Sequence, residues 1–317
     1  MDDDHAKGQA VRLGVLYGLA AYGLWGVFPL MFKPLFAYQA TPLEILAHRA
    51  IWSFLFLAVI VTAQHRWREL IAAFRTPRVL GMLAASTALI AVNWLAFLWA
   101  VSTEQVMQSS LGYFLTPLAN VALGVLVLQE RLRIGQSIGI GLATVGVLVM
   151  ATAGDRFPWI ALTLAVSFAF YGLCRKTVAV DSLIGLTAET LLMTPLGIAG
   201  VIWLETTGRA PADGWEVYML LIAAGVATAI PLLFFAASAR RLSLVTIGFL
   251  QFLGPTIQFL VAVFAFGEAF DPVKQISFGF IWLAVAVYIA DSLWAYRAGR
   301  RQPRLEDSVA QMPLEDL

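Results

Sequence analysis

Ionisable residues inside long apolar stretches of the sequence include Glu44, His48, Arg49 and Glu189. A charged side chain at the centre of a membrane helix costs about 2.5–3.5 kcal/mol on insertion scales, so it usually faces a cavity or an opposite charge. Arg49 could therefore contact an anion or a proton relay, or it could form a structural ion pair or reach the membrane interface. Glu189 could bind a coupling proton or pair with Arg49.

Glu44 and His48 are four residues apart and would share one face of a helix. Arg49 is five residues from Glu44, roughly 140° around the helix, and therefore points elsewhere. A single His–Glu pair is weak evidence for a metal, because the other histidines, His5 and His65, lie outside the apolar stretches. We expect no metal site. The pair could instead respond to protons or anchor the helix end at the membrane interface.

Uncharged polar and aromatic residues accompany these charges. Those that could bind a solute are Asn93, Trp94, Gln108, Tyr113 and Gln251. Aromatic walls with a few placed hydrogen-bonding groups suit an amphiphilic organic solute, but Asn and Gln also bond membrane helices to one another. We favour that second role for Asn120 and Gln258. Trp25, Tyr22 and Tyr171 could line the solute path, or they could pack between helices or at the interface.

The composition predicts a membrane protein. Hydrophobic residues make up 60% of the 317 residues and charged residues 13%, whereas a soluble domain carries about 25% charged residues. The net charge of +1 argues against nucleic acid, which requires clustered Lys and Arg. Cys174 is the single cysteine, so an intramolecular disulfide is excluded. No GxxxxGK[ST] nucleotide-binding loop occurs, and no cofactor is expected.

Ten segments are long and apolar enough to cross a hydrocarbon core about 30 Å thick. They are 13–32, 42–63, 79–101, 105–128, 134–152, 157–174, 182–204, 217–238, 242–267 and 275–296. The loops and tails on one side of the membrane would carry sixteen Lys and Arg residues, and those on the other side four. Because the cytoplasmic side keeps the excess of these residues, we expect both tails, 1–12 and 297–317, to be cytoplasmic.

An internal repeat links the two parts of the chain. Residues 93–150 and 231–288 align at an offset of 138, with eleven identical positions among 58. Both copies keep a proline and a glutamate thirteen residues apart: Pro117 and Glu130, Pro255 and Glu268. Proline inside a helix removes one backbone hydrogen bond and kinks the helix. The paired kinks could serve gating or could be static bends, and the glutamates are expected to fix turns.

The repeat indicates two halves of five helices each, at 13–152 and 157–296. Because five is odd, the second half enters the membrane from the opposite side, as in transporters with inverted repeats. Such halves can exchange conformations and open one central site to each side in turn. The expected fold is an all-α membrane protein with ten transmembrane helices, arranged as two inverted five-helix repeats.

Several short strings resemble those of a known group of membrane proteins. They are Glu44-Ile-Leu-Ala-His48-Arg49-Ala-Ile-Trp52-Ser53, Ser110-Leu-Gly-Tyr113-Phe-Leu-Thr-Pro117-Leu-Ala-Asn120, Phe168-Ala-Phe-Tyr171-Gly-Leu-Cys-Arg175-Lys176 and Gly248-Phe-Leu-Gln251-Phe. The two tandem halves resemble the EamA domains of the drug/metabolite transporter superfamily, and the strings are similar to its RarD subfamily. The resemblance implies a ten-helix bundle in the bacterial inner membrane, with a solute cavity between the halves. The subfamily's label implies an association with chloramphenicol sensitivity.

We expect a secondary transporter, not an enzyme, that moves a small organic metabolite or drug by alternating access. The face that carries His48 and Arg49 should border the solute cavity. The partners would be the solute, the lipid bilayer and, if transport is coupled, protons, with the chain acting as a monomer or homodimer. One alternative is a membrane-embedded sensor or scaffold, which would usually add a soluble output domain. Another is a membrane enzyme, which would need clustered His, or a Ser–His or paired-Asp site at one depth.

Overall fold

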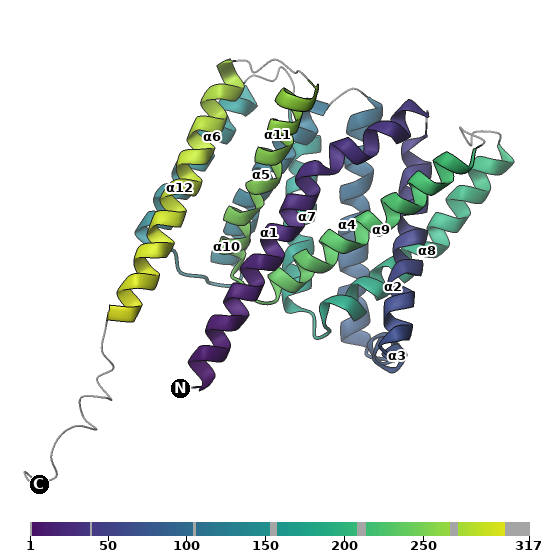
Figure 1. Cartoon of the computed structure of the whole chain (residues 1–317), viewed down its shortest axis with the longest axis horizontal. Coiled ribbons are helices and arrows are strands. Elements are labelled where there is room, and N and C mark those ends of the chain that lie inside the picture. The colour runs from purple at the N-terminus through teal and green to yellow at the C-terminus, as the bar shows by residue number, and fades with distance from the viewer. Residues whose placement is uncertain are drawn as a thin grey trace, which may run out of the picture.

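A computed structural model describes residues 2–38, 40–103, 106–152, 157–207, 214–266 and 272–301. Within these ranges every regular element is helical (Figure 1). The helices are α1 (Asp2–Ala37), α2 (Pro42–Ala63), α3 (Trp67–Arg75), α4 (Pro77–Ser102), α5 (Val106–Leu126), α6 (Ile134–Thr152), α7 (Trp159–Thr177), α8 (Ser182–Thr206), α9 (Trp215–Ala239), α10 (Leu244–Gln251), α11 (Leu253–Phe266) and α12 (Pro272–Arg301).

Seven helical segments of the described residues are long and apolar enough to cross a membrane. They are Gly8–Phe28, Pro42–Ala63, Pro77–Ala100, Ile134–Thr152, Ser182–Thr206, Trp215–Ala239 and Gln275–Ala295. Large apolar side chains also cover the outside of the bundle: Leu126, Ile134, Phe264 and Trp294 are 70–82% exposed. Such a surface is stable in lipid and not in water, so the chain is a multi-pass membrane protein.

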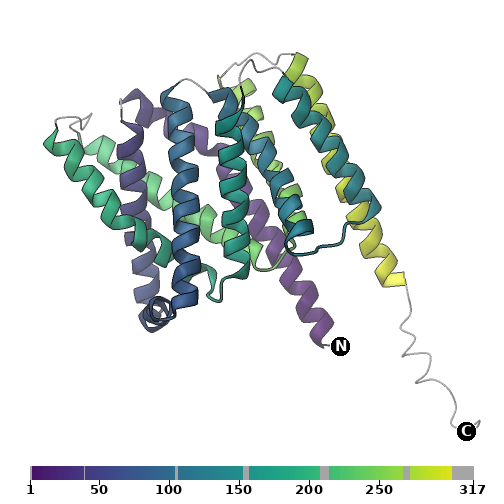
Figure 2. The same ribbon diagram turned by 180° about the vertical axis from the view of Figure 1, so that it is seen from behind.

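Helices that are far apart in the sequence pack side by side. α6 packs against α12, α5 against α7 and α10, and α2 against α8 and α9. α1, α9 and α11 lie on one broad face of the bundle (Figure 1), and α4 and α7 lie on the opposite face (Figure 2). The start of α1 and the end of α12 lie at the same end of the bundle as α3 (Figure 1), which is called the α3 end below.

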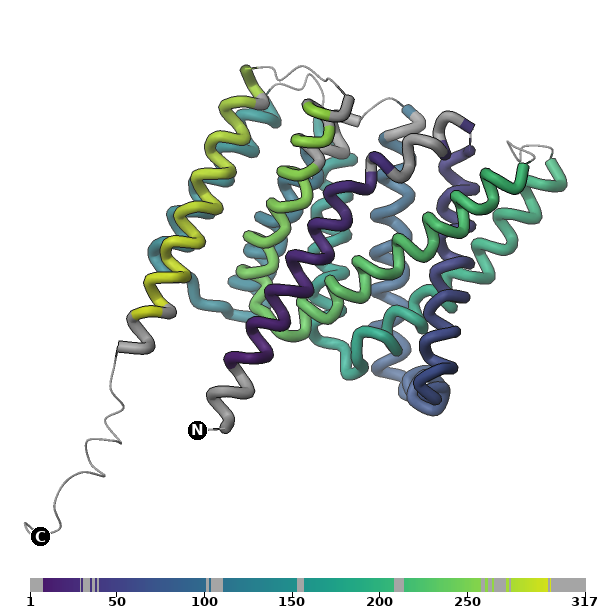
Figure 3. Tube along the Cα trace, in the orientation of Figure 1, coloured from purple at the N-terminus to yellow at the C-terminus, as the bar shows by residue number. Residues whose placement is uncertain are grey.

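α1 and α9 converge toward the α3 end (Figure 3), and a glycine allows their close approach. A Cβ atom at Gly18 of α1 would lie 2.9 Å from the Leu250 side chain and 3.0 Å from the Ser238 hydroxyl. A larger residue would therefore push α1 away from α9 and α10. Small residues are common at such crossings, because membrane helices gain their association energy from close packing.

Two helices from different parts of the chain begin in the same way. The Thr41 hydroxyl accepts a hydrogen bond from the Glu44 N–H at the start of α2, and the Glu44 carboxylate bonds back to the Thr41 N–H. Asp181 caps α8 by accepting from Leu183 and Ile184. These side chains satisfy backbone donors that the first turn of a helix leaves without partners.

The structure differs from the sequence-based expectation at two places. The connection after α2 contains the short helix α3, whose Leu70 and Ala73 are buried against the bundle. The segment expected as one span over 242–267 is two helices, α10 and α11, which meet at Phe252. Pro255 lies four residues after Gln251 and has no N–H to donate to the Gln251 carbonyl, so the helix is interrupted at this point.

Candidate functional site

Arg49 lies at a junction of helices from both halves of the chain. Its Nε donates a hydrogen bond of 2.9 Å to the Thr228 hydroxyl on α9. Its guanidinium carbon lies 4.4 Å from the centre of the Trp94 ring on α4, which is a cation–π contact. Tyr113 on α5 is close enough to interact electrostatically with Arg49. The structure therefore brings together three predicted site residues and adds Thr228, which sequence reasoning did not single out.

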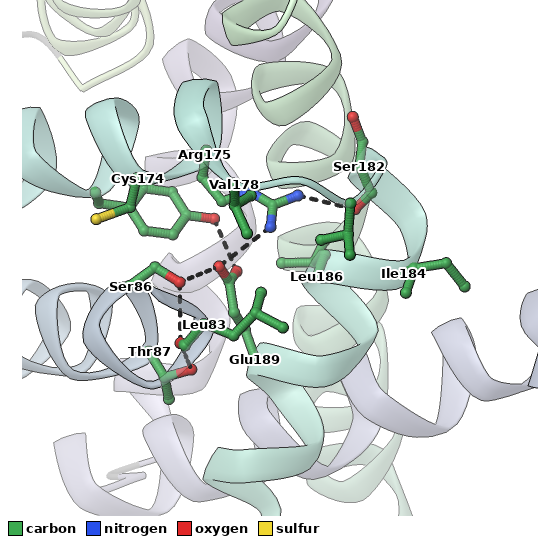
Figure 4. A network of polar contacts seen from close by, with 12 residues as sticks. Leu83, Ser86, Thr87, Cys174, Arg175, Val178, Ser182, Ile184, Leu186 and Glu189 are labelled. Atoms are coloured by element: carbon green, nitrogen blue, oxygen red, sulfur yellow. Dashed lines mark hydrogen bonds and ion pairs between the residues drawn. The ribbon is translucent and has the colours of Figure 1, made fainter. Parts of the chain in front are cut away.

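Glu189 lies in a second buried polar network, which joins α4, α7 and α8 (Figure 4). Its carboxylate accepts hydrogen bonds from Arg175 Nη1 at 3.3 Å, from the Tyr171 hydroxyl at 3.2 Å and from the Ser86 hydroxyl. Arg175 is 0% exposed and Glu189 is 1% exposed. The sequence-based pairing of Glu189 with Arg49 is therefore wrong: the ion pair is made with Arg175, at the end of α7.

A glycine makes room for the Arg175 guanidinium. A Cβ atom at Gly185 would lie only 2.0 Å from Arg175 Nη1, so a larger residue would displace the guanidinium from this position. Arg175 Nη2 also donates to the Ser182 carbonyl at 3.2 Å, so the guanidinium holds the first turn of α8 (Figure 4). In the sequence, Arg175 belongs to the Phe168–Lys176 string and to the sixteen basic residues assigned to loops and tails, and neither feature marks it as buried. Its depth in the fold is visible only once α7 and α8 are packed together.

Glu44 and His48 have contacts that differ from those of Arg49. Glu44 completes the capping box of α2, which accounts for a carboxylate at that position. Trp52 Nε1 donates a 3.1 Å hydrogen bond to His48 Nδ1, and the His48 ring lies edge-on to Tyr218 at 6.1 Å. These two partners of His48 lie on α2 and α9, near the end of the bundle opposite to the α3 end. Proton coupling through Glu44 stays a prediction.

Two of the predicted polar contacts join helices to each other. The Asn93 amide donates to the Leu164 carbonyl at 2.9 Å and to the Ser167 hydroxyl at 3.0 Å, and so ties α4 to α7. The Asn120 amide donates to Gln251 Oε1 at 2.6 Å and ties α5 to α10. These contacts agree with the helix–helix role that polar amides often have in membranes.

The remaining predicted aromatic residues meet in one cluster. Trp25 lies 5.7 Å from Phe168 and 5.9 Å from Phe235, and Tyr171 stacks on Phe235 at 5.8 Å. Tyr22 contacts both Trp25 and Phe235. These five residues are named the aromatic cluster below. The cluster belongs to the same hydrophobic core as Trp94.

The two prolines occupy different local structures. Pro117 lies inside the continuous helix α5, and a Cβ atom at Gly248 of α10 would lie 2.7 Å from its carbonyl oxygen. Pro255 lies in the first turn of α11, just after the break at Phe252. Gating through either proline stays a prediction. The side chains of Gln108 and Gln258 lie outside the described part of the structure.

A groove opens at the α3 end of the bundle, between α1, α8 and α9. Its volume is about 430 Å³. It is lined by Tyr17, Gln64, Arg66, Asp181, Ser182, Leu183, Leu233, Phe234, Ala237, Arg240 and Arg241. Three arginines and one aspartate give this lining a formal charge of +2. It is named the basic groove below.

Comparison with known proteins assigns the class of this chain. Residues 12–152 match the model of the EamA-like transporter family. A solved crystal structure superimposes on this chain with a TM-score of 0.69 and is 18% identical in sequence. The match covers 90% of this chain and 98% of the solved chain, so the two chains share a fold. The protein is thus a membrane transporter of the drug/metabolite superfamily.

The relatives narrow the family further. The Escherichia coli protein RarD is 43% identical over 288 residues, which are 90% of this chain and 97% of that protein. A Vibrio cholerae protein described as an uncharacterized transporter is 43% identical over 92% of this chain and 97% of its own length. The chloramphenicol-sensitive protein RarD of Pseudomonas aeruginosa is 34% identical over 92% of this chain and 97% of that protein. The chain therefore belongs to the EamA-like transporter family and is RarD-like.

Proposed function

We propose that the protein is a secondary transporter that moves a small organic metabolite or drug across the bacterial inner membrane by alternating access. The observation that carries this proposal is the convergence at Arg49. A membrane-embedded guanidinium contacts a hydroxyl and an aromatic ring there, and Tyr113 from a fourth helix is near enough to interact with it electrostatically. Placed polar groups against aromatic walls are typical of sites for amphiphilic solutes, and ionisable groups at membrane depth usually mark solute or ion pathways.

The packing of the helices supports ten membrane crossings in two inverted halves. The first half would comprise α1, α2, α4, α5 and α6, and the second α7, α8, α9, α10–α11 and α12. Contacts between the halves are reciprocal: α1 packs on α9 as α7 packs on α4, and α1 packs on α11 as α7 packs on α5. α2 also packs on α9 as α8 packs on α4, and the remaining large contacts pair equivalent helices, namely α2 with α8, α5 with α10 and α6 with α12. A pseudo-two-fold axis requires this reciprocity.

The orientation follows from the charges at the α3 end. Arg66, Arg240 and Arg241 line the basic groove there, and Arg133 pairs with Asp291 near the end of α12. Because Lys and Arg concentrate on the cytoplasmic side, we place the α3 end in the cytoplasm. Both termini would then be cytoplasmic as well, because α1 starts and α12 ends on that side.

Helix α9 gives the order of the parts along the proposed path. Thr228 contacts Arg49, Phe235 belongs to the aromatic cluster, and Arg240 lines the basic groove. At a rise of about 1.5 Å per residue, Phe235 lies about 10 Å and Arg240 about 18 Å along the helix axis from Thr228. We propose that the aromatic cluster separates Arg49 from the groove, and that alternating access requires the cluster to part. The break between α10 and α11 provides a point where the second half can bend.

The test is a flux screen in reconstituted vesicles with metabolites and drugs, run with and without a proton gradient. For a solute that the wild-type protein moves, Arg49→Ala is expected to lower the flux at least ~10-fold, the effect of losing a charged hydrogen bond. Arg133→Ala is the matched control, because it removes an arginine whose ion pair with Asp291 is remote from the site. Both variants should insert normally. Unchanged flux in Arg49→Ala would contradict the role of this site.

Coupling to protons is tested in the same vesicles with Glu189→Gln. If Glu189 carries the coupling proton, the substitution abolishes the dependence of solute flux on the pH gradient. Glu44→Gln tests the other candidate, whose capping contact the amide can partly keep. A flux that still responds to the pH gradient in either variant excludes that residue as the coupling group.

A further inference from the structure

We infer that Glu130 is a positioning residue of the transport cycle, whose carboxylate binds the first turn of α10 across the two proposed halves and holds the cytoplasmic end of the bundle closed. This inference rests on the proposed transport function and adds the residue that controls one of its two openings. Opening toward the cytoplasm then requires Glu130 to release α10. Four observations carry it: the bonds of the carboxylate, the turn that delivers it, the position of α10, and the neighbouring contacts between the halves.

The first observation is the pair of bonds that the Glu130 carboxylate makes. One oxygen accepts from the Leu244 N–H at 2.9 Å and the other from the Val245 N–H at 3.0 Å. Glu130 lies in the connection between α5 and α6, in the first half, whereas α10 belongs to the second. A charged acceptor makes stronger hydrogen bonds than a neutral one, and the start of a helix favours a negative charge.

These two bonds complete the cap of α10. Ser243 caps the helix from within, because its hydroxyl accepts from the Thr246 N–H at 3.1 Å. The two preceding donors, on Leu244 and Val245, are bound by Glu130. By contrast, α2 and α8 take their side-chain caps from residues at their own first turn. The start of α10 is therefore held partly from outside its own half.

The second observation is the turn that delivers the carboxylate. Gln129 has a φ of 54°, a left-handed conformation that is costly for a residue other than glycine. The Glu130 N–H donates to the Gly124 carbonyl at 2.9 Å, so the chain folds back over the end of α5. A Cβ atom at Gly124 would lie 2.7 Å from the Glu130 carboxylate and 3.2 Å from the Leu244 side chain. The backbone of Glu130 thus forms the expected turn, while its carboxylate reaches α10.

The third observation is the position of α10. This helix has eight residues and ends at the break beside Phe252, so it can tilt without carrying α11 with it. At the end next to the break, Gln251 accepts from the Asn120 amide of α5 at 2.6 Å. The first half therefore holds α10 at both ends. Release of Glu130 frees the start of α10 while the contact through Asn120 stays in place.

The fourth observation is that other bonds join the two halves at the same end of the bundle. Arg66 pairs with Asp181, and Arg133 pairs with Asp291 at 2.6 Å. The side chains of Arg66 and Arg133 are 26% and 43% exposed, whereas that of Glu130 is 16% exposed. Exposed ion pairs contribute little, because water and salt screen them. Among these contacts, the one made by Glu130 is therefore expected to resist separation of the halves most.

Lys176, at the end of α7, supports the carboxylate. Its Nζ lies 4.0 Å from Glu130 Oε1 and also donates to the Leu242 carbonyl. Glu130 thus connects the region after α5 with the end of α7 and the start of α10. α9 ends at Ala239 beside the basic groove, so α10 begins at the α3 end (Figure 1). This is the end that we place in the cytoplasm.

The test compares the two residues that cap α10, in the full chain in lipid nanodiscs. Spin labels at Ser137→Cys on α6 and Ala179→Cys after α7, both exposed positions, report the separation of the halves by double electron–electron resonance, with Cys174→Ser as background. Glu130→Ala should raise the ratio of long to short distances at least ~10-fold, the effect of losing charged hydrogen bonds. Ser243→Ala removes a cap bond within the second half and should leave this ratio unchanged.

Unchanged distances in Glu130→Ala, or the same shift in both variants, would overturn the inference, because Glu130 would then only cap a helix. Arg133→Gln should shift the ratio less than Glu130→Ala, and a larger shift would assign the closing contact to the exposed pair instead. If Glu130→Ala does not fold, Glu130→Gln keeps the size and one acceptor but not the charge. It should shift the ratio by a smaller factor, and no shift would also reject the inference.

Hydrogen exchange checks the bonds themselves. The amides of Leu244 and Val245 should exchange at least ~10-fold faster in Glu130→Ala than in the wild-type chain, because they lose their acceptor. Mass spectrometry of fragments that cover the start of α10 provides the measurement. Exchange at the wild-type rate would show that Glu130 does not hold this turn, and would overturn the inference.

The flux screen separates the inference from the function on which it rests. For a solute that the wild-type chain moves, Glu130→Ala should lower the half-saturating concentration on the cytoplasmic side and raise it on the other side, since the variant favours the cytoplasm-open state. Unchanged values on both sides leave transport standing and reject the role of Glu130. No flux of any solute, with halves that separate in Glu130→Ala and not in Ser243→Ala, rejects transport and supports Glu130 as the closing contact.

Discussion

Two arginines lie buried in the membrane region of this protein, and they are held in different ways. Arg175 forms an ion pair with Glu189, and Gly185 is needed to admit its guanidinium. Arg49 lies over the Trp94 ring and donates to the Thr228 hydroxyl. The first arrangement joins α7 to α8 with a complete pair of charges. The second places a guanidinium at a meeting point of α2, α4 and α9.

This difference shows that depth alone does not tell the role of a buried charge. Breaking a buried ion pair is costly, because the remaining charge is left without compensation. A residue in such a pair is therefore expected to affect stability first. An arginine that contacts an aromatic ring and a hydroxyl at the proposed solute site is expected to affect transport first. The following predictions test this division, beginning with the largest effect.

The largest effect is expected when the Arg175–Glu189 pair is broken. Glu189→Leu should lower the free energy of unfolding by about 3–5 kcal/mol, because it leaves the Arg175 charge buried and uncompensated. Arg175→Met/Glu189→Leu removes both charges and should recover most of that loss. The measurement is denaturant unfolding in mixed micelles. A double variant as unstable as the single one would show that packing, and not charge, explains the loss.

Arg49→Met should change the free energy of unfolding by less than about 2 kcal/mol. It removes a cation–π contact of about 0.5–2 kcal/mol, while the cost of burying the charge is also removed. The same variant should lose the stabilisation that a bound solute provides, which is about 2.7 kcal/mol at one hundred times the Kd. Unfolding with and without the solute found by the flux screen measures both. Destabilisation as large as that of Glu189→Leu would break the comparison.

A pair of tyrosines sharpens the division further. Tyr171→Phe removes one hydrogen bond to Glu189 and should lower the free energy of unfolding by about 1 kcal/mol, without changing solute affinity. Tyr113→Phe should do the reverse and weaken solute binding about 5-fold or more while the stability stays close to wild type. Unfolding curves and binding titrations on both variants provide the check. Identical effects from the two substitutions would mean that the two sites are not distinct in role.

The smallest effect concerns the exposed pair of Arg66 and Asp181 at the first turn of α8. Burial favours the neutral carboxyl of Asp181, but the hydrogen bonds from Arg66 and Ile184 outweigh it and lower its pKa below the ordinary value. A lowered pKa contributes stability above the ordinary pKa of about 3.9, and this stability is lost as the pH falls through the lowered pKa. Asp181→Asn should therefore cost about 0.2–1 kcal/mol at pH 7.

That prediction is checked by unfolding at pH 3 to 7. The wild-type chain should lose stability toward pH 3 and Asp181→Asn should lose less, because Asn has no proton to gain. Asp181→Ala is the matched variant that also removes the cap of α8, and it should cost about 1 kcal/mol more than the Asn substitution. If both variants follow the wild-type pH profile, the pair makes no contribution through the charge of Asp181.

Sequence patterns predicted the helical membrane architecture well. The bounds expected for α2 and α6 agree with the structure, and those for α4 and α8 differ by at most two residues at either end. Length and hydropathy determine a membrane helix almost by themselves, because backbone groups in lipid must be satisfied within the segment. The sequence analysis did not predict the break at Phe252 or the helix α3, because each depends on the conformational preferences of only a few residues.

The site was predicted in part. Arg49, Trp94 and Tyr113 were singled out from their types, and the structure brings them together, whereas Thr228 and Arg175 were not predicted. Thr228 is one hydroxyl among many in the sequence, and its importance comes only from its 2.9 Å contact with Arg49. Arg175 was counted with the loop charges, because its position near a helix end gives no sign of its full burial.

The sequence by itself determined that this chain lives in lipid, and it indicated which segments are apolar enough to cross it and which few charges have to be accommodated inside. Those properties depend on composition and on the local spacing of residue types, and both can be read directly from the sequence. Only the tertiary structure decided which charge meets which partner. Helices that are more than 100 residues apart supply both sides of the Ser86–Glu189 and Arg49–Thr228 contacts. Such pairings depend on how each packed helix is rotated and on its depth in the membrane. Rotating one helix by a single residue, about 100°, would bring different side chains into contact.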